Sequence, residues 1–466
     1  MLTMGGHLDL LKKKYPNDLL VIEEEINPAD FEATAVVQHL MNDKKFPALL
    51  FTHPLNLKGE VSKFPLFMNV LATREQCAIA MGMDPSQCKL PLALEYAKRE
   101  EGRIPPEVIP KDKAPVKEVV KVGDEADLRE FPIVRHHYMN PSPYITMIPI
   151  HRDLETGAYN VAFLRMQYKG PRKLGLHMAP RHNFEIVRRY EAKNLPTPTA
   201  VVVTHHPAFS LACSNQAPFA SDDYEVMGSI MGEPMRLTPS ETWGEDFMVP
   251  ADADLIIEGE IPANYREAEG PFGEYTAYFG PQLYRPIIEV KAITHCHNAI
   301  YHDVTTVPEN QVIAAVTMEG SFYSKVKAVI PTVKSLHFPN SGCGRLNCYI
   351  SIDQRFEGQA KHAASLAATL INLVKNVIVV DGDIDPFNEE QVLFAVATRM
   401  QPDEDVDIIK NITGNNLDPS VRGELMGSKM IIDATKPFGR PFEELLAVPK
   451  KAMDRIKPLL QKKGLI

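Results

Sequence analysis

The order of local patterns along the chain constrains its fold more than any other feature. Helical periodicity at Phe31–Met41 and Arg74–Met83 surrounds a short apolar run at Ala48–Phe51, which indicates an α/β unit. From about residue 119 to 307, runs rich in β-branched and aromatic residues predict mostly strands, with a helix near residues 183–193. From about residue 311 the α/β pattern returns. With 466 residues, the chain is too long for one compact core.

Two further patterns place the boundaries between these parts. The segment Ile104–Glu118 is rich in proline and lysine, which is typical of a linker. In the last part, the helical segment Glu357–Val374 precedes an apolar strand at Asn376–Val380 and a further helix after Asn388, which indicates a parallel sheet. We therefore expect an α/β domain at residues 1–117, a β domain at 118–310 and a second α/β domain at 311–466.

The last part contains an acidic loop and an amphipathic end. Asp381, Asp383 and Asp385 follow the strand and either bind a divalent cation or form a solvated turn. Asn388 is expected to cap the next helix, with Gln391 completing a capping box. An amphipathic helix is expected at residues 445–461, where it could pack on another subunit.

Composition excludes several classes of protein. A formal net charge of −10 argues against a general nucleic-acid binder, which needs a basic surface. There is no run of 18 apolar residues and no export signal at the start, so we expect a cytoplasmic protein without a membrane span. None of the six cysteines forms a C-x-x-C pair, and free thiols are expected.

The most informative chemical segment is Glu269–Glu274, with the sequence EGPFGE. Pro271 presets a turn, and the glycines beside it permit conformations closed to other residues. Such a turn can direct two carboxylates toward one point, where one of them can hold a proton near neutral pH and act as a general acid. The alternative is a surface hairpin with solvated glutamates.

A second segment, Asn160–Arg165 (NVAFLR), places an arginine in an apolar run. Such an arginine needs an anionic partner, and Glu269 or Glu274 would serve. Residues five apart on a strand face opposite sides, so Asn160 and Arg165 can share one site only if the strand bends. The alternative is an edge-strand arginine that reaches solvent.

Four other groups carry weaker signals. His177 and His182 are either ligands or structural residues, and the loop Leu211–Gln216 before Asp222 and Asp223 could bind a hard cation. Gly427–Met430 (GSKM) is too short to be a P-loop. Alternation along a strand would put His295 and His297 on one face, near His302, which outlines a zinc site and keeps a metal-dependent hydrolase as an alternative.

Taken in order, NVAFLR, PRH, EGPFGE, DPFN and GSKMIIDAT make the chain resemble the UbiD family of prenylated-flavin-dependent decarboxylases over nearly its full length. It is most similar to bacterial hydroxyarylic acid decarboxylases of the 4-hydroxybenzoate and vanillate type. The resemblance implies an N-terminal α/β domain, a central flavin-binding split β-barrel and a C-terminal α/β domain with a C-terminal helix. That order agrees with the patterns read independently above.

The resemblance also implies roles for individual residues. Arg165, Glu269 and Glu274 match the family's catalytic network, with Glu274 as the proton donor and Glu269 paired with Arg165. Asn160, His182 and Asp223 match the ligands of a divalent metal, usually Mn²⁺, although the family usually has Glu where this chain has Asp223. Carbonyl groups at a K⁺ site fall at Ala158, Ala212, Cys213 and Asn215. Prenylated FMN would contact Thr146, Asn160, Ala162, Phe163, Leu164, Arg165, Arg181, His182, Cys213, Asn215 and Lys429. Arg181 stands where the family usually has a different residue.

The implied reaction is the reversible, non-oxidative decarboxylation of an aromatic, heteroaromatic or α,β-unsaturated acid by a carboxy-lyase. The flavin accepts the charge left when CO₂ departs, while the protein supplies orientation and a proton. Expected partners are a small carboxylic acid, CO₂, a separate flavin prenyltransferase and further copies of the chain in a homo-dimer or homo-hexamer. An FMN-dependent oxidoreductase related to flavin reductases is the main alternative, and a non-catalytic subunit is another. The substrate stays open.

Overall fold

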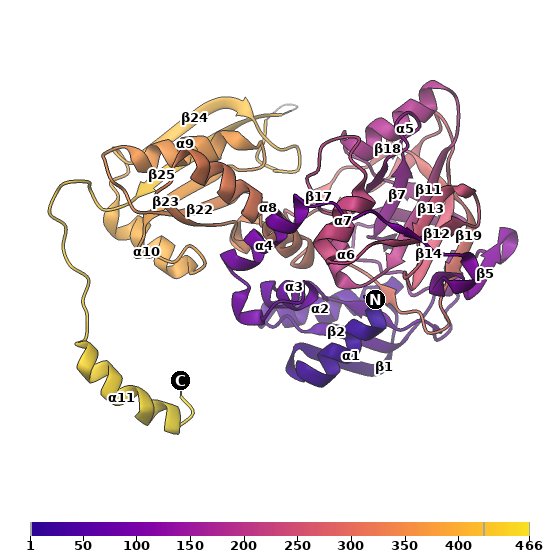
Figure 1. Cartoon of the computed structure of the whole chain (residues 1–466), viewed down its shortest axis with the longest axis horizontal. Helices are drawn as coiled ribbons and strands as arrows, with labels where there is room; N and C mark the ends of the chain where they lie inside the picture. The colour runs from indigo at the N-terminus through magenta and orange to yellow at the C-terminus, as the bar shows by residue number, and fades with distance from the viewer. Residues whose placement is uncertain (1, 423–424, 466) are drawn as a thin grey trace.

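The computed structural model describes residues 2–422 and 425–465, and these form an N-terminal unit, a central sheet and a C-terminal lobe (Figure 1). The N-terminal unit has a four-stranded sheet in the order β1-β2-β3-β20. Its strands are β1 (Leu19–Ile26), β2 (Ala48–Pro54), β3 (Leu66–Met68) and β20 (Tyr301–His302). Its helices are α1 (Met4–Lys14), α2 (Glu32–Asn42), α3 (Arg74–Ala80) and α4 (Leu90–Glu100). Strand β20 belongs to this sheet although it lies far from β1, β2 and β3 in the sequence.

The central unit is built on a nine-stranded antiparallel sheet in the order β6-β9-β10-β19-β14-β11-β7-β8, with β5 paired to β19. Its strands are β5 (Val119–Val122), β6 (Tyr144–Ile145), β7 (Ile148–Arg152), β8 (Tyr159–Val161), β9 (Met166–Gly170), β10 (Lys173–Leu176), β11 (Thr197–Thr204), β14 (Leu255–Ile261) and β19 (Ile287–His295). The end strands β6 and β8 are not paired with each other in the described part of the chain, so the sheet does not close.

Smaller sheets and three helices complete the central unit. The small sheets contain β4 (Glu107–Val108), β12 (Arg236–Ser240) and β13 (Gly244–Pro250); β15 (Glu267–Glu269) and β18 (Leu283–Arg285); β16 (Phe272–Gly273) and β17 (Phe279–Gly280). The helices are α5 (His182–Ala192), α6 (Pro207–Ala212) and α7 (Asp223–Met231). The predicted linker is held along this unit, because β4 pairs with β12 and the Val116 N–H donates to the Ala251 carbonyl.

The C-terminal lobe begins with α8 (Glu309–Val329), which lies between the lobe and the rest of the molecule (Figure 1). Its sheet has the order β21-β22-β23-β25-β24, and β22, β23 and β25 run parallel as predicted. Its strands are β21 (Val333–His337), β22 (Asn347–Ile352), β23 (Asn376–Asp381), β24 (Val406–Thr413) and β25 (Met426–Ala434), and its helices are α9 (Gln359–Leu370) and α10 (Glu389–Arg399). Single 3₁₀ turns lie at Pro16–Asp18, Pro28–Asp30, Pro85–Gln87, Lys111–Lys113, Pro115–Lys117, Gly123–Glu125, Leu128–Glu130 and Asn340–Gly342.

One hydrophobic core spans the N-terminal and central units, and the C-terminal sheet has separate cores. One cluster of buried side chains includes Phe51 of the N-terminal sheet, Phe131, and Ile256 and Ile293 of the central sheet. The C-terminal sheet has its own clusters on its two faces, around Val379 and Val380. Helix α8 packs closely on α4, since a Cβ at Gly320 would lie 1.9 Å from the Ala93 carbonyl oxygen.

The last helix, α11 (Lys450–Lys462), stands away from the body at the end of an extended segment (Figure 1). Its apolar residues are exposed, together with those of the segment before it: Leu445, Leu446, Val448, Met453, Ile456 and Leu459. In the described residues, no helix is long and apolar enough to cross a bilayer.

Two local predictions about the C-terminal lobe need correction. Asn388 caps α10 by accepting a hydrogen bond from the Gln391 N–H at 3.2 Å, but the Gln391 side chain accepts from the Asp385 N–H and so forms no capping box. In the acidic loop, Asp381 and Asp383 accept hydrogen bonds from Arg399, at 2.6 and 2.8 Å. Because an arginine neutralises these carboxylates, the loop is neither a cation site nor a simple solvated turn.

Candidate active site

The turn at Glu269–Glu274 directs both of its carboxylates to Arg165. Strand β15 ends at Glu269, and the chain reverses through Gly270 and Pro271 into β16. Gly270 has φ +90°, and a Cβ there would lie 3.0 Å from the Pro281 carbonyl oxygen, so a glycine is required. Two carboxylates close in sequence thus reach one cation, as the turn residues predicted.

Arg165 is the centre of this cluster. Its Nε donates to Glu269 Oε1 at 3.0 Å and its Nη2 to Glu269 Oε2 at 3.2 Å, while Nη1 donates to Glu274 Oε1. The guanidinium also lies over the Phe272 ring, 4.9 Å from its centroid. The side chains of Arg165, Glu269 and Glu274 are 7%, 0% and 14% exposed, so the charges are largely removed from water.

The bend required between Asn160 and Arg165 is present. Strand β8 ends at Val161 and β9 begins at Met166, so the ladder is interrupted over residues 162–165. Within this interruption the Leu164 N–H donates to the Met147 carbonyl at 3.1 Å, and the Ala162, Phe163 and Leu164 side chains stay partly exposed. Asn160 and Arg165 therefore flank an accessible segment of backbone.

His177 belongs to the same cluster, although its sequence position favoured a structural role. Its Nδ1 lies 3.2 Å from Arg165 Nη2 and 3.4 Å from Glu269 Oε2. Burial lowers the pKa of His177, and the Arg165 charge lowers it further, so the ring is neutral at pH 7. Burial alone would raise the pKa of Glu269, but hydrogen bonds from His177 and Arg165 hold it below its usual value.

Tyr144 is a further buried neighbour that the sequence did not reveal. Burial raises the pKa of its hydroxyl, and the nearby Glu269 charge raises it further. Its ring lies 4.5 Å from that of Phe272. Neither His177 nor Tyr144 could be linked to Glu269 by sequence spacing, because about 100 residues separate them.

A second polar group lies at the start of α5 and α7. His182 Nδ1 is 3.2 Å from Asn160 Oδ1, and Asn160 Nδ2 donates to Asn183 Oδ1 at 2.6 Å. Asp223 is buried and accepts a hydrogen bond from the Val161 N–H at 2.7 Å, next to Asn160. Burial raises the pKa of Asp223 to about 7. Within the described residues, Asp223 forms no ion pair with a basic side chain. A buried carboxylate, an amide oxygen and a neutral imidazole are donor types that suit a divalent cation.

The carbonyl groups predicted for K⁺ are only partly free. The Ala158 carbonyl accepts from the Asp153 N–H at 2.8 Å, and the Ala212 carbonyl accepts from both the Asn215 N–H and its side-chain amide. Cys213 is buried, and Asn215 Oδ1 accepts from the Ala217 N–H at 3.0 Å. The Ala158 carbonyl has a second lone pair that a cation could use, whereas the Ala212 carbonyl could bind one only in place of a hydrogen bond from Asn215.

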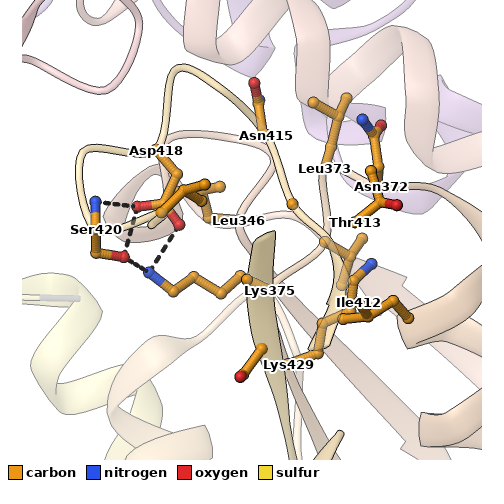
Figure 2. A pocket seen from close by; sticks show the side chains of 15 residues that line it. Leu346, Asn372, Leu373, Lys375, Ile412, Thr413, Asn415, Asp418, Ser420 and Lys429 are labelled. Carbon is orange, nitrogen blue, oxygen red and sulfur yellow. Dashed lines mark hydrogen bonds and ion pairs between the residues drawn. The ribbon is translucent and has the colours of Figure 1, made fainter. Parts of the chain in front are cut away.

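Thr146 and Lys429 are engaged elsewhere. The Thr146 hydroxyl is bonded to Asp303 Oδ1 at 3.0 Å and to the Val304 carbonyl at 2.7 Å. Lys429 lies on β25, where its ammonium donates to the Ala368 and Ile371 carbonyls at the end of α9. It lines a cavity of the C-terminal lobe in which Lys375 is neutralised by Asp418 at 2.8 Å (Figure 2). This cavity therefore does not hold the paired carboxylates or the Asn160 cluster.

The histidine pattern predicted as a zinc site is wrong in its geometry. Strand β19 ends at His295, so His297 lies beyond it in a turn and is exposed, while His302 is fully buried in β20. Among residues 2–422 and 425–465, no three His, Cys, Asp or Glu side chains come together to hold a metal ion. The set formed by Asn160, His182 and Asp223 contains only two such side chains, because its third member is an amide.

Comparison with known proteins identifies the family of this chain. Three sequence profiles match it in order, described as the N-terminal, Rift-related and C-terminal domains of 3-octaprenyl-4-hydroxybenzoate carboxy-lyase, over residues 10–89, 107–310 and 311–434. The phenolic acid decarboxylase of Bacillus subtilis is 31% identical, with 90% of this chain and 89% of that protein covered. The anhydromevalonate phosphate decarboxylase of Methanothermobacter thermautotrophicus is 28% identical, with 91% and 96% covered.

Among solved structures, the UbiD-class enzyme HmfF from Pelotomaculum thermopropionicum in complex with FMN superposes with a TM-score of 0.89 at 34% identity, covering 98% of this chain and 99% of that one. An evolved dimeric form of the same enzyme, in complex with prenylated FMN, superposes with a TM-score of 0.86 at 32% identity, with the same coverage. The mixed α/β fold matches these enzymes across both chains. The protein described here therefore belongs to the UbiD family of carboxy-lyases.

Proposed function

We propose that this chain uses prenylated FMN to decarboxylate an aromatic, heteroaromatic or α,β-unsaturated carboxylic acid, reversibly and without net oxidation. The observation that carries the proposal is the buried contact of Arg165 with both Glu269 and Glu274. When bound, the modified flavin supplies an electrophilic carbon that accepts the electron pair released as CO₂ leaves. The chain itself must then orient the acid, exclude water and deliver a proton.

Glu274 is the proposed proton donor. It sits on a turn rather than in the sheet, and it is the more exposed of the two carboxylates at 14%. The contact with Arg165 favours its charged form, so Glu274 must separate from Arg165 before it can hold a proton. Glu269 stays charged, because His177 and Arg165 lower its pKa, and it keeps the guanidinium in place when Glu274 moves.

The residues present fit the implied cofactor and metal. Asn160, His182 and Asp223 would hold a divalent cation such as Mn²⁺, since their donor types suit one and Asp223 is buried with no ion pair to a basic side chain of the described residues. Carbonyls at Ala158, Ala212, Cys213 and Asn215 would hold K⁺, and the interrupted segment Ala162–Leu164 would border the flavin. Thr146 would meet the flavin only through its backbone or methyl group, and Lys429 only after a change in its present hydrogen bonds.

We further propose that residues 118–310 form the flavin-binding split β-barrel between α/β domains at 1–117 and 311–466. The order of the central sheet and the profile boundary between residues 310 and 311 support this division. The exposed apolar side of α11 supports a contact with a second copy of the chain, in a homo-dimer or homo-hexamer. A flavin prenyltransferase would supply the cofactor in the cytoplasm.

The class of acid stays open in this proposal. The names of the two relatives point to a phenolic acid in one case and to a phosphate-bearing acid in the other, at similar identity. The similarity alone therefore does not choose between substrates with and without a second anionic group.

The test combines cofactor loading with one substitution. The protein is produced together with a flavin prenyltransferase and Mn²⁺, and native mass spectrometry is expected to find prenylated FMN bound. Glu274→Gln should retain the flavin but lose on the order of 10²- to 10⁴-fold in turnover, because the proton donor is gone. The matched control is Glu267→Gln on β15, where Glu267 pairs with Lys173 instead of Arg165.

Three results would contradict the proposal. Full turnover by flavin-loaded Glu274→Gln would remove its proton-donor role. Bound unmodified FMN that oxidises NAD(P)H would instead support an oxidoreductase. Failure to bind any flavin would refute the cofactor assignment.

A further inference from the structure

Arg345 is a guanidinium of the C-terminal lobe that reaches the proposed active site. It follows Cys343 and Gly344, and its guanidinium carbon lies 4.2 Å from the centroid of the Tyr275 ring. Tyr275 directly follows Glu274 in the chain, so Arg345 links the C-terminal lobe to the segment that carries the proposed proton donor. Its Nη2 donates to Asn310 Oδ1 at 2.9 Å.

The loop that carries Arg345 is held in place. Gly344 has φ +66°, and a Cβ there would lie 2.2 Å from the Gln311 carbonyl oxygen, so the loop touches the start of α8 closely. The Gln311 amide in turn donates to the Tyr275 carbonyl at 2.6 Å, and Asn415 donates to the Tyr275 hydroxyl. Arg345 is therefore positioned by a fixed frame rather than by an anion.

In the described residues, Arg345 makes no ion pair. Its charge is balanced only by the Asn310 amide oxygen, a distant Cys343 carbonyl at 3.5 Å and the face of the Tyr275 ring. Burial is the main cause that lowers the pKa of Arg345 to about 10, and the charge of Arg181 acts in the same direction. A partly buried guanidinium without a carboxylate is unfavourable unless a ligand supplies the anion.

Arg181 is a second cation of the proposed site, from the central unit. It is the N-cap residue of α5, immediately before His182, and its side chain is exposed. Within the described part of the chain it also makes no ion pair, and its charge is one of the causes, after burial, that lower the pKa of Arg345. Among the described residues, Arg181 and Arg345 are thus two cations without an ion pair, one next to His182 and the other on the Tyr275 ring.

We propose that Arg181 and Arg345 bind a second anionic group on the substrate, so that the natural substrate is an unsaturated or aromatic acid carrying an additional carboxylate or phosphate. The group that leaves as CO₂ would lie toward Arg165, and the second anion would lie between the two lobes. Both arginines offer forked donors that match a carboxylate or a phosphate. This inference rests on the proposed function and selects the substrate class left open there.

The test uses enzyme loaded with prenylated FMN and three acid skeletons: benzoic, furoic and acrylic. Each skeleton is supplied as the unsubstituted monoacid, as a dicarboxylic acid and as a monoacid bearing a phosphate ester. In at least one skeleton, a doubly anionic acid should show a kcat/KM at least about tenfold above that of its monoacid, since a charge-assisted hydrogen bond contributes about that factor or more. The dicarboxylate and phosphate arms distinguish the two kinds of second anion.

Substitutions connect this preference to the two arginines. Arg345→Met should lower kcat/KM for the preferred dianionic acid by roughly 10- to 100-fold and leave that for the monoacid within about threefold. Arg181→Gln should lower the ratio of the two kcat/KM values by a similar factor, whatever the loss of a flavin contact does to both. Arg181 is exposed, so Arg181→Gln keeps the test valid even if Arg345→Met folds poorly. The matched control is Arg355→Met, which removes an exposed arginine of the same lobe and should change neither value.

A readout without turnover separates substrate from cofactor. Binding of unmodified FMN to the apoprotein, followed by fluorescence, should be within about threefold in Arg345→Met and wild type. Weaker FMN binding with an unchanged preference among acids would overturn the inference, because the anion would then be the flavin phosphate. Equal or slower turnover of all dianionic acids would also overturn it. If flavin-loaded enzyme converts none of the acids, and exchanges no deuterium into the expected products, the proposed function itself fails.

Discussion

Arg165 and Arg345 approach the same active site from two lobes, but the protein treats their charges differently. Arg165 contacts two carboxylates and lies against a neutral histidine. Arg345 contacts an amide, a carbonyl and an aromatic ring, and in the described residues no carboxylate pairs with it. The charge of Arg165 is neutralised within the chain, whereas the charge of Arg345 is available to a ligand.

The two arginines separate a charge used for chemistry from a charge available for recognition. A cation that the fold already neutralises can organise groups of opposite charge and hold them before substrate enters. A cation that the fold leaves unpaired adds little to stability, and its value appears only when an anion binds. The predictions below test this contrast through the stability of the protein, apart from its turnover.

The largest effect is expected from Arg165→Met. The substitution leaves the Glu269 carboxylate at 0% exposure without its cation, beside the neutral His177 ring and the Tyr144 hydroxyl. An uncompensated buried charge costs about 3–5 kcal/mol, so the free energy of unfolding should fall by that order. Urea denaturation of the apoprotein measures it, since neither cofactor nor substrate is needed.

A double substitution provides the control. In Arg165→Met with Glu269→Gln the buried charge is absent, so most of the lost stability should return, with a coupling energy of roughly 1–3 kcal/mol. If Arg165→Met alone leaves the denaturation midpoint unchanged, Arg165 is not the internally paired cation described above.

Much of this paired site could be predicted from sequence, because the residues that determine it lie close together in short segments. Gly270 and Pro271 require a tight turn, and a turn of that length brings Glu269 and Glu274 together. The arginine in an apolar run required an anionic partner, and the interruption after Val161 lets it face the same side as Asn160. The parallel C-terminal sheet and most helices were likewise predicted from periodicity.

The rest depended on contacts between distant segments. His177 and Tyr144 reach Glu269 across about 100 residues, and β20 pairs with β3 from the other end of the central unit. The prediction for His295 and His297 was wrong because the strand ends at His295, two residues before His297. Arg345 had no local signal at all, because what distinguishes it is the lack of a partner, and that needs a structure.

Lowering the pH should distinguish the contribution that buried neutral histidines make to stability from the contribution of the Arg165 cluster. Burial lowers the pKa of His7 to about 4, and those of His205 and His302 to about 3. The unfolded chain binds protons near pH 6.5 and the folded chain does not, so stability should fall as pH drops below 6.5. Each such histidine contributes a slope of about 1.4 kcal/mol per pH unit down to its folded pKa. The Glu269 contribution has the same direction but is lost only at lower pH, below the usual glutamate pKa.

One substitution isolates the histidine contribution. His302 is fully buried and neither ring nitrogen has a hydrogen-bond partner, so His302→Phe should reduce the slope by about 1.4 kcal/mol per pH unit between roughly pH 6 and 4.5. Urea denaturation at several pH values measures it, with the exposed His39→Gln as the control. An unchanged slope in His302→Phe would show that His302 is protonated in the folded protein.

The smallest effect is expected at Arg345, and its size decides the contrast. Arg345→Met loses a hydrogen bond to Asn310 and a contact with Tyr275, but it also removes a desolvated charge, so the free energy of unfolding should change by less than about 1 kcal/mol. Arg399→Met in the same lobe is the matched comparison, since Arg399 is 1% exposed and bonds Asp381 and Asp383. Partial exposure of those carboxylates limits its cost to roughly 1–3 kcal/mol. If Arg345→Met proves as costly as Arg399→Met, Arg345 is a structural residue of the lobe, and its missing carboxylate no longer points to a ligand.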